Sequence, residues 1–175
     1  MRGMEINRLA PEDAGALPAL PGSYILVLHA AQHGEITVGR LGRVTVTPGW
    51  YLYTGSALGP GGLRGRVRHH VQPVAHPHWH IDYLRQVCTM TEVWYTVAAQ
   101  RLEHVWATVL MQSATPIPGF GASDCDCAAH GFHQLHRPEL ADFVAAMMRQ
   151  ASPVTRHSSL VTCMRDAMTP DALSV

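Results

Sequence analysis

The sequence predicts a single α+β domain. Strand-like and helix-like segments are mixed along its 175 residues, without the regular strand and helix alternation that builds a parallel sheet. A hydrophobic fraction of 47% against a charged fraction of 15% is typical of a folded chain with a buried core. We expect residues 19–150 to form the domain, residues 1–18 a loosely packed arm, and residues 151–175 a weakly ordered tail.

Strands are expected where β-branched and aromatic residues cluster between glycine and proline turns. Residues 23–30 form a continuous apolar run, and residues 35–41 follow as a returning strand that residues 44–47 extend. Residues 50–54 and 91–97 are also rich in strand-forming side chains. These segments predict the sheet of the domain.

Helices are expected where apolar residues repeat with a period near 3.6 or where proline and glycine bound a helix-forming run. The clearest period lies in residues 98–111, and residues 138–150 fit a final helix. Residues 63–71 and 78–85 have shorter helical patterns, and residues 123–130 predict a tight polar loop.

Charge argues mildly against a nucleic-acid partner, because the formal net charge is zero. For phosphate binding, the local clustering of basic residues matters more than the total charge of the chain. The 13 basic residues are all arginine, which base composition explains more simply than function does. One dense basic patch stands out, and the planar fork of arginine suits it to phosphate. It consists of Arg64, Arg66, Arg68, His69 and His70.

Nothing in the sequence predicts a membrane protein or an exported one. No apolar run approaches the roughly 20 residues that a bilayer-spanning helix needs, and the first residues lack the pattern of a secretory signal. We therefore expect a cytoplasmic protein. Four cysteines in such a chain are unlike a disulfide framework; they are Cys88, Cys125, Cys127 and Cys163.

The residues with the strongest chemical character lie between Tyr51 and His70. Two segments cover this stretch: Gly49-Trp-Tyr-Leu-Tyr-Thr-Gly-Ser56 and, after a glycine-rich turn, Arg64-Gly-Arg-Val-Arg-His-His70. One more tyrosine, Tyr24, lies upstream. Cleavage of a phosphodiester bond needs a base, a fixed cation beside the phosphate, and hydrogen-bond donors. The stretch supplies all of these residue types.

The order of these motifs resembles the GIY-YIG endonuclease superfamily, in particular its small Uri-type branch. Gly22-Ser-Tyr-Ile25 is similar to the first motif and Tyr53-Thr-Gly55 to the second. Arg66-Val-Arg-His-His70 is similar to the helical motif. The stretches His78-Trp-His-Ile-Asp-Tyr-Leu84 and Gly119-Phe-Gly-Ala-Ser-Asp-Cys-x-Cys127 are similar to that branch, and the resemblance spans residues 21–132.

This resemblance implies a small three-stranded antiparallel sheet flanked by helices and a metal-dependent DNA endonuclease. It implies that Tyr24 and Tyr53 position the attacking water with His70, that Arg66 binds the phosphate, and that Glu103 holds Mg²⁺ or Mn²⁺. The implied partner is DNA. The oligomeric state stays open. Ser23 and the Ser123-Asp124 pair depart from the usual family pattern.

Each of these residues also has a more ordinary interpretation. Most strand tyrosines are simply half-buried, and a helical arginine is usually a solvated charge. Glu92 is the other glutamate considered for the metal, and Glu103 is preferred because the family carries its acid on the helix after the third strand. A nucleic-acid-binding or adaptor module that cuts slowly or not at all is the alternative function.

A second group of residues has ligands suited to zinc. These are Cys125, Cys127, His130 and His133, with His78 or His80 as distant candidates to complete the site. A Cys-x-Cys pair is tighter than the usual zinc spacing. Thiols packed beside the sheet are therefore the preferred interpretation, and a structural Zn²⁺ at Cys125, Cys127 and His130 is the alternative. Asp82, with His78 and His80, has functional character but no assigned role.

Overall fold

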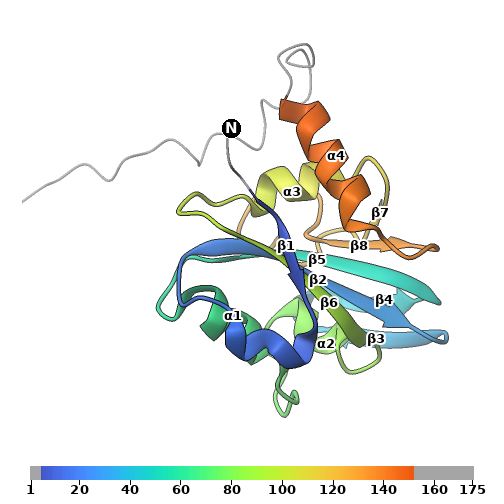
Figure 1. Ribbon diagram of the computed structural model, residues 1–175. Helices are drawn as coiled ribbons and strands as arrows, with labels where there is room; N and C mark the ends of the chain where they lie inside the picture. Colours follow the sequence, from blue (N-terminus) through green and yellow to red (C-terminus); the bar gives the residue numbers. More distant parts are fainter. Residues whose placement is uncertain (1–4, 152–175) are drawn as a thin grey trace, which may run out of the picture.

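Three long strands form the centre of the main sheet. The computed structural model describes residues 5–151, and in it β2 (Gly22–Ala30) lies between β5 (Gly49–Ala57) and β6 (Thr89–Val97), antiparallel to both. These are the strands predicted at residues 23–30, 50–54 and 91–97, so the α+β class is confirmed (Figure 1).

The main sheet is larger than the three strands that the resemblance implied. It has six strands in the order β1-β6-β2-β5-β8-β7. The additional strands are short, which is why the sequence did not reveal them: segments of two to four residues are too short to show a period. They are β1 (Asn7–Leu9), β7 (Thr115–Pro116) and β8 (Gly131–Gln134).

Residues 34–46 form a separate hairpin rather than a strand returning along β2. Strand β3 (Gly34–Val38) pairs antiparallel with β4 (Gly42–Val46), and a 3-10 turn, Gly39–Leu41, joins them. Val38 and Val46 are fully buried against the core. The prediction that residues 44–47 extend the preceding strand is therefore wrong, because the glycines that bound this turn reverse the chain.

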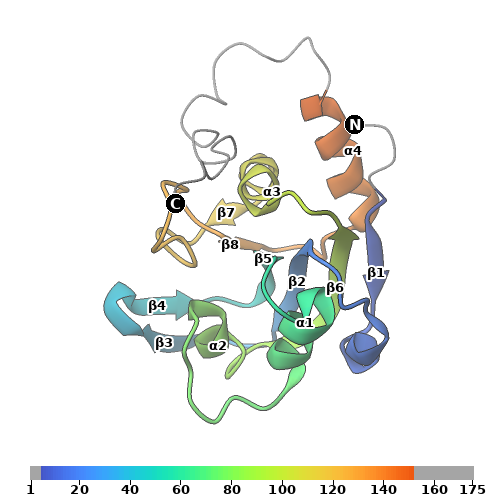
Figure 2. The same ribbon diagram turned by 90° about the vertical axis from the view of Figure 1, so that its left-hand side faces the viewer.

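Both faces of the sheet are covered, as the edge-on view in Figure 2 shows. One face packs against α1 (Gly62–Val71), α2 (His80–Leu84) and the hairpin; the other packs against α3 (Glu103–Leu110) and α4 (Leu140–Ala151). Alternate residues of β2 serve the two cores, with Leu26 on the first and Val27 on the second. Burial on both faces explains the continuous apolar run of β2.

The expected loose arm at residues 1–18 is wrong for the part that the structure describes. Strand β1 pairs with β6, and a 3-10 helix, Pro11–Ala16, follows it. Ala14 and Leu17 are each 1% exposed, and the Leu17 carbonyl accepts a hydrogen bond of 2.7 Å from Arg64 Nε. The tail predicted from residue 151 lies outside the described residues, apart from Ala151 at the end of α4.

The expected helices are present at 62–71, 80–84 and 140–151, but the one predicted from residue 98 begins at Glu103. The chain before it is tied to strand β2 instead. The Leu102 backbone N–H donates to Ser23 Oγ at 3.1 Å, and the Ala98 N–H donates to the Pro21 carbonyl at 3.0 Å. Between residues 5 and 151, no helix has both the length and the apolar character needed to cross a bilayer.

Candidate functional site

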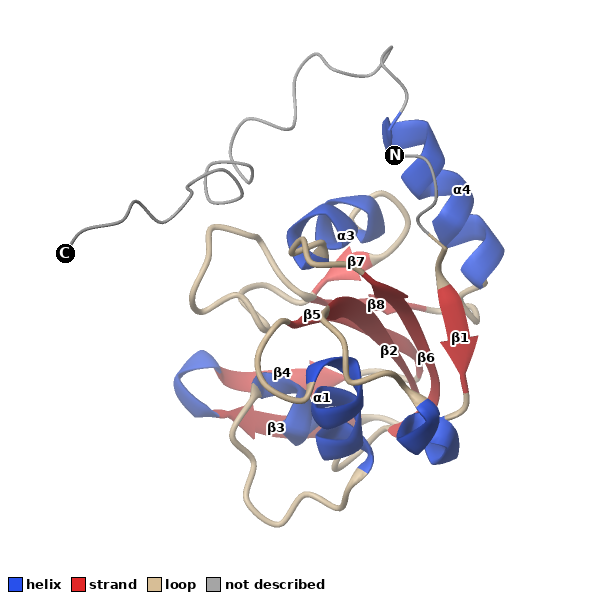
Figure 3. Ribbon diagram, turned by 60° about the vertical axis from the view of Figure 1, so that its left-hand side comes forward, coloured by secondary structure: helices blue, strands red, loops and turns tan. Residues whose placement is uncertain are grey.

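A polar cleft of about 630 Å³ opens where the start of β2 and the end of β5 meet helices α1, α2 and α3. Figure 3 shows the long loops that surround this end of the sheet. All the residues that the sequence singled out for catalysis line the cleft; they are Tyr24, Tyr53, Arg66, His70 and Glu103. The fold brings them together from β2, β5, α1 and α3.

Tyr24 and His70 form a buried hydrogen-bonded pair. The Tyr24 hydroxyl lies 2.8 Å from His70 Nε2, and the two residues are 2% and 1% exposed. Burial raises the pKa of Tyr24 well above its ordinary value and lowers the pKa of His70 to about 3, with Arg85 contributing to the latter. At neutral pH the pair is therefore an uncharged phenol and an uncharged imidazole.

Two glycines allow the tyrosine rings to lie against the backbone. Gly55 is paired with Tyr24 across the strands, and a Cβ at position 55 would lie 2.5 Å from the Tyr24 hydroxyl oxygen. Gly121 has φ +76°, and a Cβ there would lie 2.8 Å from Cε2 of Tyr53. Only glycine is compatible with both the backbone and the ring at position 121.

Tyr53 is half-buried, and its ring meets Phe120 edge-on at 6.2 Å between centroids. Burial and the nearby Glu103 carboxylate raise the pKa of Tyr53. Its hydroxyl makes no hydrogen bond to any other residue of the described chain. The hydroxyl is thus a protonated group in a polar cleft, suited to orienting a ligand.

Arg66 carries a positive charge into the cleft without a carboxylate partner. Within residues 5–151 no acidic group lies within ion-pair distance of it, and its guanidinium carbon stacks over the Trp79 ring at 4.7 Å. The neighbours on its helix, Arg64 and Arg68, are exposed and do not line the cleft. The chemistry of such an arginine suits it to binding an anion.

Asp82 organises the segment that supports Arg66. Its carboxylate accepts hydrogen bonds from the backbone N–H groups of His78 and Trp79, at 3.1 and 3.0 Å, and lies 3.6 Å from Arg85. Asp82 is 2% exposed. The sequence left the role of Asp82 open. In the structure its carboxylate holds the backbone of Trp79, whose ring lies under the guanidinium of Arg66.

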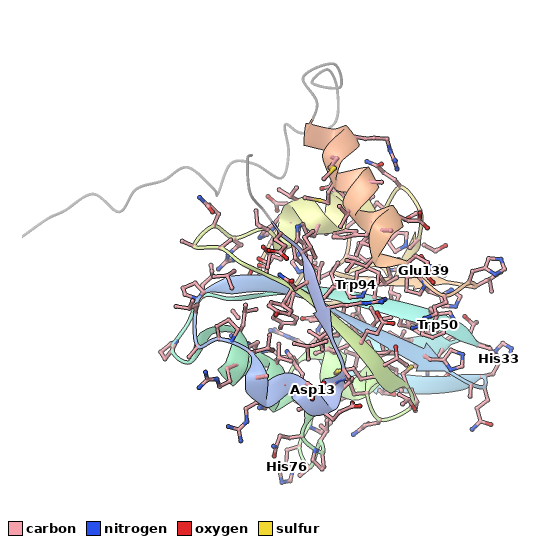
Figure 4. All side chains as sticks on the ribbon, in the orientation of Figure 1. Asp13, His33, Trp50, His76, Trp94 and Glu139 are labelled. Atoms are coloured by element: carbon pink, nitrogen blue, oxygen red, sulfur yellow. The ribbon has the colours of Figure 1, made fainter. Side chains whose placement is uncertain are left out.

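His78 and His80 both line the cleft. His80 Nδ1 accepts a 2.8 Å hydrogen bond from the Gly121 N–H, so the neutral ring carries its proton on Nε2. The labelled His33 and His76 are exposed at the periphery of the molecule and do not line this cleft (Figure 4).

Glu103 is the first residue of α3, and its side chain is 12% exposed. Its Oε1 atom lies 3.4 Å from Arg101 and 3.4 Å from His104 Nε2. Glu92 is bound instead to Trp94 and Arg137 and does not line the cleft. Trp94, labelled in Figure 4, lies in the second core beneath α4. Of the two glutamates, only Glu103 is placed to hold a ligand in the cleft.

Further residues of the cleft were assigned no role from the sequence. Arg40 belongs to the hairpin turn and Arg101 to the loop before α3, while Asp124 comes from the polar loop. They are distant in sequence and show no common pattern, so only the folded chain brings them to one cavity.

A cluster of two cysteines and two histidines adjoins the cleft and could hold a metal ion. The ligand atoms of His104, Cys125, Cys127 and His130 all lie within 4.8 Å of one another. The sequence analysis did not include His104 in this cluster. His104 follows Glu103 in the first turn of α3. His133, which was expected in the cluster, instead has its Nε2 atom 3.2 Å from Thr47 Oγ1.

Fold and site together define an α+β protein whose polar cleft gathers tyrosine, arginine, histidine and glutamate beside a metal-capable cluster. The chain belongs to the family described as Domain of unknown function DUF123, which matches residues 23–153. Comparisons with curated proteins and with solved structures gave no match.

Proposed function

We propose that this protein is a metal-dependent endonuclease of the GIY-YIG type that hydrolyses phosphodiester bonds in DNA. The observation that carries the proposal is the convergence of Tyr24, Tyr53, Arg66, His70 and Glu103 on one cleft. These residues come from separate elements, and a purely structural role for each would not require them to share a cavity.

Arg66 binds the phosphate in this scheme. Because the described chain gives it no carboxylate partner, its guanidinium donors are available to a phosphoryl oxygen. Stacking on Trp79 holds the group in place before the substrate arrives. A fixed donor of this kind stabilises the negative charge that grows on the phosphoryl oxygens in the transition state.

The two tyrosines orient the attacking water, and the Tyr24–His70 pair accepts its proton. The water proton moves to the Tyr24 oxygen while the Tyr24 proton moves to His70 Nε2, 2.8 Å away. The low pKa of His70 opposes this transfer in the free protein. A bound phosphate brings negative charge to the cleft, which favours the imidazolium.

Glu103 is suited to a hard cation, since Mg²⁺ is commonly held by one or two carboxylates together with waters and a phosphate. Asp124 lines the same cleft and supplies a second carboxylate. When bound, Mg²⁺ or Mn²⁺ would stabilise the charge on the leaving 3′ oxygen. A thiophilic metal in the neighbouring His/Cys cluster would be structural and would take no part in the reaction.

The test is cleavage of labelled single-stranded, duplex and branched DNA in Mg²⁺ or Mn²⁺. We expect Arg66→Ala and Glu103→Ala each to lower the rate by about 10²–10³-fold or more, the usual effect of removing one transition-state contact. Arg68→Ala, exposed on the same helix as Arg66, is the matched control and should cut at the wild-type rate. Wild-type cleavage rates in both Arg66→Ala and Glu103→Ala would refute the assignment of these two residues to the active site.

The second candidate is a DNA-binding or adaptor module that cuts slowly or not at all. The observation that favours it is the pairing of Glu103 with Arg101 and His104, because these groups compete with a cation for the carboxylate. A mobility shift of DNA without metal-dependent nicking would select this function over the nuclease.

A further inference from the structure

The His/Cys cluster joins the polar loop to the start of helix α3. His104 comes from the first turn of α3, and the other three residues come from the segment between Cys125 and His130. His104 Nδ1 lies 3.1 Å from Cys127 Sγ, and His130 Nε2 lies 3.5 Å from Cys125 Sγ. The four atoms therefore form a compact set contributed by two separate parts of the chain.

The ligand chemistry of this set selects the metal. Two thiolates and two imidazoles are a recognised tetrahedral zinc set, with bonds of about 2.3 Å to sulfur and 2.0–2.1 Å to nitrogen. Tetrahedral geometry with those bonds separates nitrogen from sulfur by about 3.6 Å, close to the 3.1 and 3.5 Å observed. Hard cations such as Mg²⁺ prefer oxygen ligands.

We propose that His104 Nδ1, Cys125 Sγ, Cys127 Sγ and His130 Nε2 bind one structural Zn²⁺ ion that fixes the carboxylate of Glu103. Four protein ligands leave no open position, so the ion holds structure rather than activating water. It cross-links the loop of residues 121–130, which contains no strand or helix, to α3.

The link to Glu103 runs through the second nitrogen of His104. With Nδ1 on the metal, the neutral ring has its proton on Nε2, which faces Glu103 Oε1 at 3.4 Å. This is the carboxylate–histidine–zinc arrangement, in which the outer partner and the ligand orient each other. Glu103 in turn lines the polar cleft, as does His130. The effect on Glu103 rests on the proposed nuclease function, whereas the zinc site itself does not.

The first test measures metal in the full-length protein after expression with added zinc. We expect one Zn²⁺ per chain, and a cobalt-substituted form with the strong visible bands of tetrahedral Co²⁺ and a thiolate charge-transfer band. Cys125→Ser, Cys127→Ser and His130→Asn should lose the metal and these bands. Cys88→Ala and His136→Ala, which lie outside the cluster, should keep them.

A conservative exchange keeps the test decisive if those variants fail to fold. His104→Cys offers a third thiolate in place of the imidazole, so it should retain one metal ion and show a stronger charge-transfer band. Zinc-free wild type, or full zinc content in the serine variants, would overturn the site. These outcomes do not depend on DNA cleavage, so they separate the zinc site from the proposed activity.

The same variant tests the positioning of Glu103. His104→Cys keeps the zinc but removes the imidazole beside the carboxylate, and we expect Mn²⁺ binding in the cleft, followed by electron paramagnetic resonance, to weaken by about tenfold or more. The Mg²⁺ concentration for half-maximal cleavage should rise in parallel. Unchanged Mn²⁺ affinity in a zinc-loaded variant would show that the ion does not orient Glu103.

Discussion

At the scale of single residues, Gly55 controls where the Tyr24 hydroxyl lies. The two residues are paired between β2 and β5, and the hydroxyl occupies the space that a side chain at position 55 would fill. This places the hydroxyl within 2.8 Å of His70. The glycine of the second sequence motif thus serves the tyrosine of the first.

Gly55→Ala should disrupt this pair. The new Cβ would lie 2.5 Å from the Tyr24 oxygen, so the ring must move and the hydrogen bond to His70 is lost. We expect a loss of about 1–3 kcal/mol in the free energy of unfolding, measured with urea, and a large fall in DNA cleavage. Gly59→Ala is the matched control, since nothing lies within 4 Å of its Cβ. Equal stability of the two variants would contradict this account.

His70 should make the stability of the protein depend on acid. Its folded pKa of about 3 is below the ordinary value of 6.5, so the unfolded chain binds the extra proton between these values. Stability is then complete above about pH 6.5 and falls as the pH drops towards 3, by at most about 1.4 kcal/mol per pH unit. His70→Gln should flatten this part of the curve in urea unfolding from pH 7 to 4. If the free energy of unfolding fell with pH at the same slope in wild type and His70→Gln, the assignment of this acid dependence to His70 would be refuted.

At the scale of elements, the segment between α1 and α2 supports the guanidinium of Arg66, the proposed phosphate-binding group, from beneath. Asp82 holds the backbone of residues 78 and 79, and Trp79 lies under Arg66. The helix α2 is short, so its N-terminal hydrogen bonds contribute a large part of its stability. A change at Asp82 therefore affects both the element and the site.

Asp82→Ala should be strongly destabilising. It leaves the Arg85 guanidinium, 9% exposed, without its partner and removes the acceptor of two backbone N–H groups. Breaking a buried pair in this way costs about 3–5 kcal/mol. Glu35→Ala, whose partner Arg43 is 79% exposed, should change stability by less than about 1 kcal/mol. The free energy of unfolding of both variants can be measured by thermal and urea unfolding. Similar losses of stability in Asp82→Ala and Glu35→Ala would contradict the structural role of Asp82.

At the scale of the whole molecule, the neutral net charge contrasts with the arginines gathered at the cleft. The formal charge is zero, yet Arg40, Arg66 and Arg101 all line this one cavity. On the proposed nuclease function, DNA would be attracted by this local cluster of arginines rather than by the total charge. Its binding should therefore depend only moderately on salt.

This can be measured as the slope of log Kd against log salt concentration for a labelled duplex, by fluorescence anisotropy without Mg²⁺. Three phosphate contacts would give a slope of magnitude no greater than about 3. Arg66→Ala should reduce that magnitude by about 1, whereas Arg68→Ala should leave it unchanged. A magnitude above about 5 would mean that DNA contacts a much larger surface than the cleft.

Local patterns in the sequence were sufficient to predict the longer elements, and motif order was sufficient to select several residues that line the cleft. Strands β2, β5 and β6 carry long apolar or aromatic runs, and α1 and α4 have clear boundaries, so these were predicted close to their observed positions. Tyr24, Arg66 and Glu103 were singled out by motif order, and they line one cavity in the folded chain.

The tertiary structure alone decided the remaining features, because they depend on contacts between distant residues. Strands β1, β7 and β8 exist through pairing with longer neighbours, and too few residues are involved to show a period. His104 joins Cys125 and His130 only when the polar loop folds onto α3. A histidine on a helix has no local signal that distinguishes a metal ligand from a surface residue, so its partners in space supply that information.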